Sequence, residues 1–408
     1  MSSTTVLLAD GPLATLDLVA LGATTELLWR SPAITLVGVG ATRSIPLKLG
    51  SSRDEATTLL ADSMGASEDT LPGRGPVGFL TLPFDREAPG VMLVPEVVIT
   101  ESDGERFVTA LDGRPVEAIS AHVNDLLAEP RATPPTAIEL LLDRSADSWR
   151  DDVVAPARDR IAGSDLEKAV LARLLTLRAN TDFVLRPLIT SLAERFADAM
   201  IFSIDGFVGA SPELLVSRMG RTVRAHPLAG TAARSLDPDV DARQIEALHA
   251  SAKDRVEHQI TIDWLLAELL AFCSYVDAEP EPSTLTLANV HHLGTLVEGV
   301  LSEPAASVLD LVDAIHPTPA LGGAPQRDAI DLIEELEGFD RHRYGGPSGW
   351  IDSSGNGEFA VSIRAAQVRG NEATIAAGVG VVAESDPQAE LVETQAKFRA
   401  MLGTFLAG

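Results

Sequence analysis

Turn signals at short spacing constrain the fold of this chain more than any other feature. The stretch AMIFSIDGFVGASPELLVSRMGRTVRAHPLAGT (199–231) contains short apolar runs separated by Asp205-Gly206 and by Met219-Gly220. Pairs of this kind between apolar runs are typical of tight β-hairpins. We therefore predict two successive hairpins here, and a fold that contains antiparallel strands.

Other segments extend this pattern. The run KAVLARLLTLRA (168–179) has strand character, and residues 1 to about 130 alternate apolar runs with turns such as Asp103-Gly104. The Pro-rich segment 129–138 is predicted to be a connector, and residues 340–383 return to strands. Strands mixed with long helices, without regular βαβ alternation, predict an α+β fold built on antiparallel sheets.

Two long helices are expected in the second half of the chain. One is predicted from Asp239 to about Cys273, and another closes the chain after residue 384. Cys273 is the only cysteine, so an internal disulfide is excluded, and we expect it to be an inert core residue within the first of these helices.

Composition limits the partners. The chain has 408 residues, 45% of them hydrophobic, with 32 basic and 59 acidic side chains and a formal net charge of −27. This charge makes nucleic acid and anionic membranes poor partners, and an anionic substrate would need local cations or a metal. The N-terminus lacks a basic leader and no apolar run reaches spanning length, so we expect a soluble, cytoplasmic protein.

Two carboxylate pairs are candidate metal ligands. Glu390 and Glu393 follow a helix start with Ser385 as the expected N-cap, Pro387 in the first turn and Gln388 at capping-box spacing. Positions i and i+3 share a helix face, where Mg²⁺ could neutralise them. The alternative, which this stretch alone favours, is a solvated acidic helix end.

The matching pair lies in KDRVEH (253–258), where Asp254 and Glu257 have the same spacing. Two helices that each offer two carboxylates can form an oxygen cage for Mg²⁺. The alternative is that these acids pair with neighbouring Lys or Arg side chains on a solvated face.

Lys168 and Glu213 are candidate proton-transfer groups. Lys168, on the strand face of Val170 and Ala172, is either at an edge and reaches solvent or is buried and able to act as a base. Glu213, in GASPELL, is either a solvated strand-end carboxylate or a general acid with a raised pKa.

Further residues indicate a ligand wall. Gly378 and Gly380 lie inside a strand, where glycine is costly unless backbone or ligand approaches closely. The loop HPTPALGG (316–323) is pinned by proline. Arg364 in an apolar strand would need an anionic partner, structural or substrate. For His291 and His292, core packing or substrate hydrogen bonding is more plausible than metal binding.

The order of these motifs is more specific than any one of them. EKAVLAR, GASPELLVSR, HPLAGTAAR, SAKDRVEH, VHHLGTLVEG, HPTPALGG, FDRHRYGGPSGW, SIRAAQV, AAGVGVV and SDPQAELVETQAK together resemble the chorismate-utilising enzymes. That family includes isochorismate, anthranilate, aminodeoxychorismate and salicylate synthases. The resemblance implies one chorismate-binding domain over residues 1–408, with a variable N-terminal part (1–135) and a catalytic part (155–405). The implied fold is that of anthranilate synthase component I: antiparallel β-sheets packed as a sandwich and flanked by helices.

The resemblance also implies roles. Lys168 looks like the base that activates water for attack at C2 of chorismate, and Glu213 like the acid that protonates the departing C4 hydroxyl. The implied Mg²⁺ cage consists of Asp254, Glu257, Glu390 and Glu393, of which Glu257 and Glu393 are the preferred direct ligands. The implied substrate-binding residues are Gly230, Thr231, His292, Ala320, Leu321, Tyr344, Arg364, Gly378 and Gly380.

Within the family, the loop HPTPAL is most similar to isochorismate synthases, so we expect a monomeric, Mg²⁺-dependent isomerase that feeds menaquinone or siderophore biosynthesis. Ala229 stands where usual aminodeoxychorismate synthases have an attacking lysine, so water or ammonia is the expected nucleophile. Thr231 departs from the serine frequent in isochorismate synthases. Salicylate synthase and anthranilate synthase component I are the alternatives, and a non-catalytic metabolite-binding relative is a third possibility.

Overall fold

The computed structural model describes residues 3–50, 58, 71–130, 132–287 and 290–406. The strands are, in chain order, β1 (Thr4–Leu7), β2 (Leu28–Arg30), β3 (Ile34–Leu47), β4 (Val77–Thr81), β5 (Gly90–Ser102), β6 (Glu105–Ala110), β7 (Ile138–Leu142), β8 (Lys168–Ala179), β9 (Met200–Ile204), β10 (Phe207–Ser211), β11 (Leu214–Met219), β12 (Thr222–His226), β13 (Leu228–Ala233), β14 (Cys273–Ala278), β15 (Ser283–Thr286), β16 (Val290–Gly294), β17 (Val297–Leu301), β18 (Gly323–Ala324), β19 (Pro347–Asp352), β20 (Gly357–Val361), β21 (Ala365–Arg369) and β22 (Glu372–Val381).

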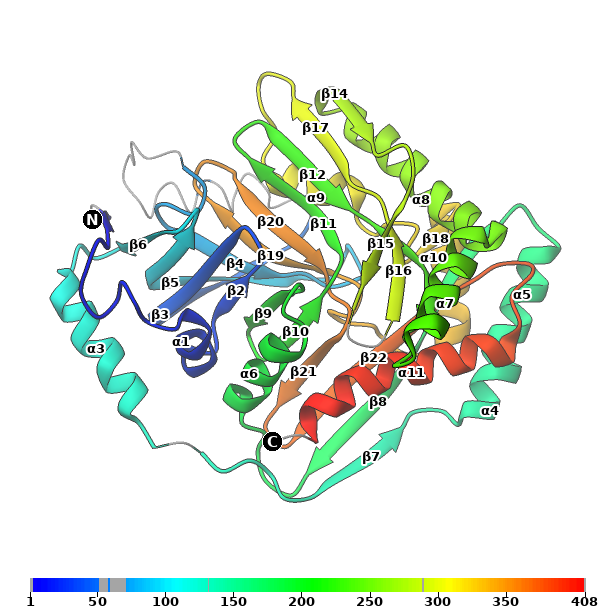
Figure 1. Cartoon of the computed structure of the whole chain (residues 1–408), viewed down its shortest axis with the longest axis horizontal. Helices are drawn as coiled ribbons and strands as arrows, with labels where there is room; N and C mark the ends of the chain where they lie inside the picture. Colours follow the sequence, from blue (N-terminus) through cyan, green and yellow to red (C-terminus); the bar gives the residue numbers. More distant parts are fainter. Residues whose placement is uncertain (1–2, 51–57, 59–70, 131, 288–289, 407–408) are drawn as a thin grey trace.

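The helical segments lie mostly around the periphery of the strand network (Figure 1). They are α1 (Leu18–Thr25), α3 (Val116–Ala128), α4 (Ala146–Trp149), the π-helical turn η1 (Arg150–Val154), α5 (Ala155–Ala162), α6 (Leu185–Arg195), α7 (Pro238–Ala250), α8 (Ala252–Leu270), α9 (Val308–Ile315), α10 (Gln326–Glu337) and α11 (Pro387–Phe405). None of the helices in the described ranges is long and apolar enough to cross a membrane.

The sheet topology confirms the predicted α+β class. Within the described residues, nineteen strands form one hydrogen-bonded network, and β13, β16 and β15 form a separate sheet. Every pairing between these strands is antiparallel. The two predicted hairpins are confirmed as β9–β10 and β11–β12, and the strand predicted over 168–179 is β8.

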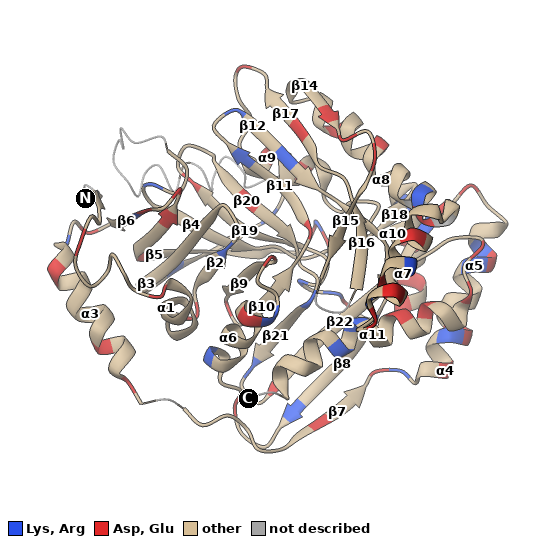
Figure 2. Ribbon diagram, viewed as in Figure 1, with Lys and Arg blue, Asp and Glu red and all other residues tan. Residues whose placement is uncertain are grey.

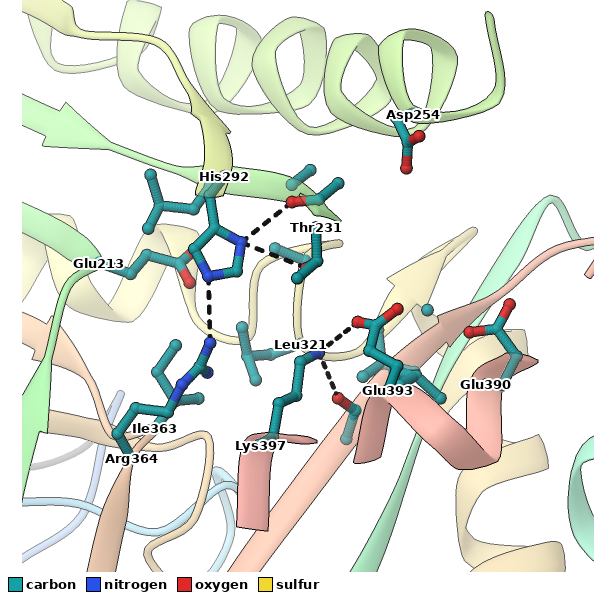
Figure 3. A pocket seen from close by; sticks show the side chains of 18 of the residues that line it. Glu213, Thr231, Asp254, His292, Leu321, Ile363, Arg364, Glu390, Glu393 and Lys397 are labelled. Atoms are coloured by element: carbon teal, nitrogen blue, oxygen red, sulfur yellow. Dashed lines mark hydrogen bonds and ion pairs between the residues drawn. The ribbon is translucent and has the colours of Figure 1, made fainter. Parts of the chain in front are cut away.

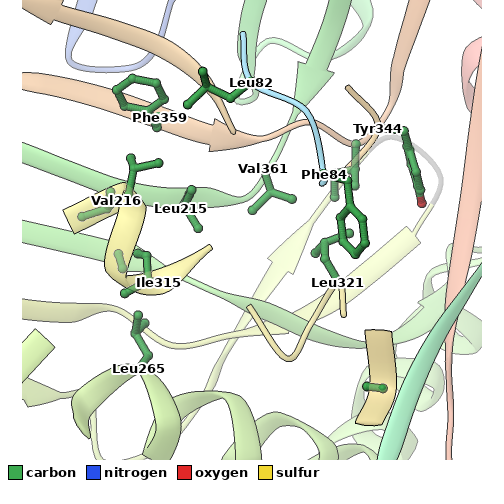
Figure 4. Close-up of a cluster of buried hydrophobic side chains, with 14 of the residues drawn as sticks. Leu82, Phe84, Leu215, Val216, Leu265, Ile315, Leu321, Tyr344, Phe359 and Val361 are labelled. Atoms are coloured by element: carbon green, nitrogen blue, oxygen red, sulfur yellow. The ribbon is translucent and has the colours of Figure 1, made fainter. Parts of the chain in front are cut away.

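Buried aromatic side chains join strands that are neighbours in this network and strands that are not. Trp29 of β2 stacks on Phe202 of β9 with ring centroids 6.4 Å apart, and its indole N–H donates to Glu358 of β20 at 2.9 Å. A second cluster packs β11, β20, α8 and α9 together and includes Leu321 and Tyr344 (Figure 4). These two residues also line the cavity described below, so core packing fixes part of the cavity wall.

The single long helix predicted from Asp239 to Cys273 is wrong in two respects. The chain breaks at Ser251, whose backbone is extended and whose hydroxyl accepts a hydrogen bond from the Asp254 N–H at 3.2 Å. Ser251 therefore ends α7 and caps α8, which places Asp254 in the first turn of α8. Cys273 begins strand β14 rather than lying in a helix, although it is a buried free cysteine as expected.

The start of the last helix also differs by one residue from the prediction. Asp386, not Ser385, is the N-cap of α11, and it accepts from the Ala389 N–H at 2.8 Å. Ser385 instead accepts from the Val382 N–H at 3.1 Å and closes the preceding turn. Pro387 occupies the first turn as predicted. The correction leaves Glu390 in the first turn of α11, where the helix dipole favours a carboxylate.

Candidate active site

One cavity collects most of the residues that the sequence analysis selected. The space between the atoms of this cavity and its mouth amounts to about 700 Å³, open solvent included. Strands β8, β13, β16 and β22 form its walls together with the amino-terminal halves of α8 and α11 (Figure 3). The lining residues are Val170, Glu213, Leu228, Ala229, Gly230, Thr231, Asp254, His292, Ala320, Leu321, Tyr344, Ile363, Arg364, Gly378, Val379, Gly380, Glu390, Glu393 and Lys397.

The nine residues predicted to bind substrate all line this cavity, as do Glu213, Asp254, Glu390 and Glu393. The sequence therefore identified side chains that the fold brings together from distant segments. Their individual roles stay predictions. The side chain of Glu257 lies outside the described residues, so the fourth member of the predicted cage has no structural account.

Lys168 is the one predicted catalytic residue with a described side chain that does not line the cavity. It is only 1% exposed at the start of β8, which is paired with β22 and β18, so the alternative of an edge lysine that reaches solvent is wrong. Val170 lies two residues further on the same strand face and does line the cavity. The charge of Lys168 is close enough to lower the pKa of Glu213.

Glu213 is a buried acid in the short connection between β10 and β11. Its side chain is 3% exposed, and its backbone is held by hydrogen bonds with Ser211 Oγ at 3.3 Å and the Val361 N–H at 3.0 Å. Burial raises the pKa of Glu213 to about 7, although the Leu228 N–H and the nearby cations oppose the shift. Near neutral pH this carboxyl can therefore both hold and release a proton.

Arg364 and His292 form a polar pair on one side of the cavity. Arg364 donates to His292 Nε2 at 3.1 Å, and His292 Nδ1 lies 2.9 Å from the Gly230 carbonyl and 3.2 Å from Thr231 Oγ1 (Figure 3). Burial, followed by the charge of Arg364, lowers the pKa of His292 to about 3. The ring is therefore neutral, with its proton assigned to Nδ1 because Nε2 must accept from Arg364.

The backbone of Arg364 is strained. Its φ of 51° lies in the left-handed region, which costs a non-glycine residue on the order of 1–3 kcal/mol. The carbonyl of Arg364 accepts a hydrogen bond from the Ala210 N–H at 3.0 Å, which holds this conformation between β20 and β21. The fold thus maintains an unfavourable conformation that directs a cation into the cavity, a pattern common at functional sites.

The opposite side of the cavity carries three carboxylates and one lysine. Asp254 extends from α8, and Glu390 and Glu393 extend from α11 (Figure 3). Glu390 is only 4% exposed. Lys397, one helical turn after Glu393, lies 2.7 Å from its carboxylate and donates to the Gly378 carbonyl at 2.8 Å. A group of basic and acidic side chains therefore occupies this side of the cavity.

The donor types on α8 and α11 fit Mg²⁺, which prefers carboxylate oxygens and usually keeps several waters. Among the described side chains, no three His, Cys, Asp or Glu residues approach closely enough to form a metal centre. Asp254, Glu390 and Glu393 nevertheless line one cavity. The observation supports the predicted ligand type, and the cage itself stays a prediction.

Lys397 is the main functional candidate that the sequence analysis missed. Its position four residues after Glu393 was the available signal, because residues at i and i+4 share a helix face. The remaining wall residues that were not selected are apolar. They are Val170, Leu228, Ile363 and Val379. Nothing in their local sequence separates them from ordinary core residues.

Gly378 permits a close approach, as predicted for the glycines of this strand. A Cβ atom at residue 378 would lie 2.9 Å from the Tyr344 hydroxyl and 3.4 Å from a methyl group of Val170. Tyr344 is buried, and its hydroxyl accepts a hydrogen bond from the backbone of Gly378. Any larger residue at position 378 would displace the Tyr344 side chain from the cavity wall.

Gly230 positions Asp254. It has a φ of 66° at a bulge in β13, and a Cβ there would lie 3.0 Å from the Asp254 Cβ. We expect Gly230→Ala to lower the free energy of unfolding by about 1–2 kcal/mol through its positive φ and to displace Asp254. The rise in unfolding temperature on adding Mg²⁺ should then be smaller than in the wild type.

The control for this prediction is Gly104→Ala in the β5–β6 turn. Gly104 has a φ of 75° and no atom within 4 Å of the added Cβ. Urea unfolding should show a similar loss of stability in both variants, whereas only Gly230→Ala should weaken the Mg²⁺ effect. An equal Mg²⁺ effect in both variants would contradict the role assigned to Gly230.

Comparison with known proteins places this cavity in context. A family profile described as chorismate binding enzyme matches residues 2–406. Isochorismate synthase EntC of Escherichia coli K12 is 33% identical over 337 residues, which cover 81% of this chain and 82% of that protein. Isochorismate synthase DhbC of Bacillus subtilis is 41% identical over 254 residues, which cover 60% of this chain and 64% of that protein.

A solved structure shows the same fold. The menaquinone-specific isochorismate synthase MenF of Escherichia coli superposes with a TM-score of 0.80 at 22% sequence identity, over 99% of this chain and 94% of that chain. At this identity the likeness supports the fold alone.

Proposed function

The chain belongs to the family of chorismate binding enzymes, and from this membership we propose that it is an isochorismate synthase. The enzyme converts chorismate reversibly to isochorismate, with attack of water at C2 and loss of the hydroxyl group at C4. It is therefore an isomerase. The relatives that carry this name, at 33% and 41% identity, support the assignment.

The observation that carries the proposed chemistry is the buried carboxyl of Glu213 in a cavity with local cations. The substrate is a dianion, whereas the chain as a whole has a formal charge of −27. Acidic residues recur along helices such as α3, α7 and α8 (Figure 2). Arg364 and Lys397 line the cavity and supply positive charge where the substrate carboxylates would bind.

The proton transfers balance in this proposal. Lys168 takes a proton from the water molecule whose oxygen bonds to C2. The ring double bond shifts, the C4–oxygen bond breaks, and Glu213 gives its proton to the departing hydroxyl, which leaves as water. A carboxyl with a pKa of about 7 is suited to this role, because a general acid is most effective when its pKa is near the working pH.

Mg²⁺ is part of the proposal. Asp254, Glu257, Glu390 and Glu393 would hold it, and the bound ion would supply positive charge to a substrate carboxylate. Glu257 and Glu393 are the proposed direct ligands. His292, neutral and fixed by Gly230 and Arg364, would line the ring pocket without adding charge.

The nucleophile is water in this proposal. Ala229 lines the cavity and carries no nucleophilic group, so attack by a side chain at this position is excluded. Salicylate and anthranilate synthases of the same family also release pyruvate from the substrate. The distinction between these reactions therefore depends on the products.

We expect purified protein incubated with chorismate and Mg²⁺ to form isochorismate as a mixture with chorismate, without pyruvate. Chromatography of the products and a coupled pyruvate assay measure this directly. Addition of ammonium ions provides the control for anthranilate formation. Pyruvate release without an added lyase, or anthranilate in the presence of ammonium, would contradict the proposed function.

A further inference from the structure

A buried ion pair lies behind the cavity wall. Arg341 and Glu337 are 5% and 4% exposed, and Arg341 Nε donates to Glu337 Oε2 at 2.9 Å. A second guanidinium nitrogen of Arg341 donates to the other carboxylate oxygen, so the pair is bidentate. That oxygen also accepts from the Ala172 N–H of β8 at 2.6 Å. Glu337, at the end of α10, thus fixes Arg341 against β8.

The remaining donors of Arg341 bind two backbone segments of the cavity wall. One guanidinium nitrogen donates to the Leu321 carbonyl at 2.9 Å, and the other donates to the Val170 carbonyl at 2.5 Å. The Tyr344 N–H in turn donates to the Arg341 carbonyl at 2.9 Å. Leu321, Val170 and Tyr344 all line the cavity, whereas Arg341 does not.

The planar guanidinium therefore reinforces the contact between β8 and the loop that contains Leu321, which the Val170 N–H also joins directly by donating to the Gly322 carbonyl at 2.9 Å. Its other side is closed by Phe84, whose ring centroid lies 4.3 Å from the guanidinium carbon. Lys168 is two residues before Val170 on the same strand face. A shift of the Val170 carbonyl would therefore also move Lys168, the proposed base. Its distance from Glu213, in the connection between β10 and β11, would change.

We infer that Arg341, oriented by Glu337, is a positioning residue for the reaction in this cavity. It touches neither substrate nor reacting atoms, and it acts by holding β8 and the Leu321 loop in the geometry that catalysis requires. The inference rests on the proposed function, because it takes this cavity as the place where chorismate reacts. Misplacement by about 1 Å can lower an enzymatic rate on the order of 100-fold.

The test is Arg341→Lys, which keeps a cation beside Glu337 and loses the planar fork that spans both carbonyls. We expect kcat of the folded enzyme for chorismate to fall roughly 10- to 100-fold with KM little changed, and the unfolding temperature to fall because lysine cannot satisfy both buried carbonyls. A second variant, Glu337→Gln with Arg341→Gln, removes both buried charges together and leaves an amide oxygen for the Ala172 N–H. It should show the same loss of kcat.

The control is Arg160→Ala. Arg160 of α5 pairs with Glu335, which lies on α10 as Glu337 does. Both side chains of this pair are more than half exposed, so this variant should retain wild-type kcat. Wild-type kcat in either Arg341 variant would overturn the inference. So would a loss of kcat matched by an equal loss of folded, chorismate-binding protein. A wild-type enzyme without activity on chorismate would instead refute the proposed function.

Discussion

Replacing Glu213 with glutamine should lower kcat for chorismate by about 10²- to 10⁴-fold. Glutamine fits the same buried space, but it has no acidic proton to give to the departing C4 hydroxyl. KM should change little, because the amide keeps the volume and polarity of the side chain. Steady-state kinetics with product chromatography measure both constants.

The wild-type pH profile tests the same assignment without a mutation. Glu213 must be protonated for the conversion of chorismate, so this rate should fall as the pH rises above the pKa of about 7. The isomerisation takes up and releases no net proton, so kcat/KM measured from isochorismate should show the same pH dependence as kcat/KM measured from chorismate. A wild-type profile without an inflection near this pKa, or an inflection that Glu213→Gln leaves in place, would contradict the role of Glu213 as the acid.

Glu213→Gln should lose activity but gain stability at high pH. The folded pKa of Glu213, about 7, lies above its ordinary value of 4.5, so its contribution to stability is fully present below pH 4.5. That contribution is lost as the pH rises through 7, when the buried carboxyl must ionise. Glu213→Gln should therefore be more stable than the wild type at pH 8, by up to about 3 kcal/mol in urea unfolding.

Glu358→Gln is the matched control for these measurements. Glu358 is also a buried acid whose pKa is raised by burial, and it accepts from the Trp29 indole away from the cavity. This variant should alter the pH dependence of stability and leave kcat unchanged. If it lowered kcat as strongly as Glu213→Gln, the loss would reflect folding rather than acid catalysis.

The strands were predictable because each boundary has a local cause. Asp205-Gly206 forms a turn in which both residues have positive φ, and in the next hairpin the turn is Gly220-Arg221, where Gly220 alone has a positive φ. The helix break at Ser251 was missed, although Ser251 and Asp254 have the spacing of a helix N-terminus. At the start of α11, both Ser385 and Asp386 can cap a helix, and only the preceding turn decides between them.

The lining of the cavity was predictable as a set, but its chemistry was not. The order of the motifs identified Glu213 and Arg364, yet neither the burial of Glu213 nor the left-handed φ of Arg364 follows from adjacent residues. Both depend on strands that are remote in sequence. Arg341 shows the same limit, because its partners Val170 and Leu321 are 171 and 20 residues away.

Removal of Mg²⁺ should abolish turnover, with a loss of at least about 10³-fold in the presence of a chelator. A bound divalent ion supplies several kcal/mol of charge stabilisation, which corresponds to a factor of this size. Glu393→Gln should raise the Mg²⁺ concentration required for half-maximal activity more than Glu390→Gln does, because Glu393 is the proposed direct ligand. Titration of kcat with Mg²⁺ measures this order.

Thermal unfolding provides a measurement that does not depend on turnover. An ion that binds only the folded protein raises its stability by RT ln(1 + [Mg²⁺]/Kd), so the unfolding temperature should rise with Mg²⁺ in the wild type. This rise should be reduced in Glu393→Gln and retained in Glu384→Gln, which changes an exposed acid just before α11. Lys397 pairs with Glu393 at 2.7 Å, so a bound Mg²⁺ and this cation would compete for one carboxylate. If Mg²⁺ stabilised Glu393→Gln and the wild type equally, Glu393 would not be a ligand and the pair with Lys397 would be its whole function.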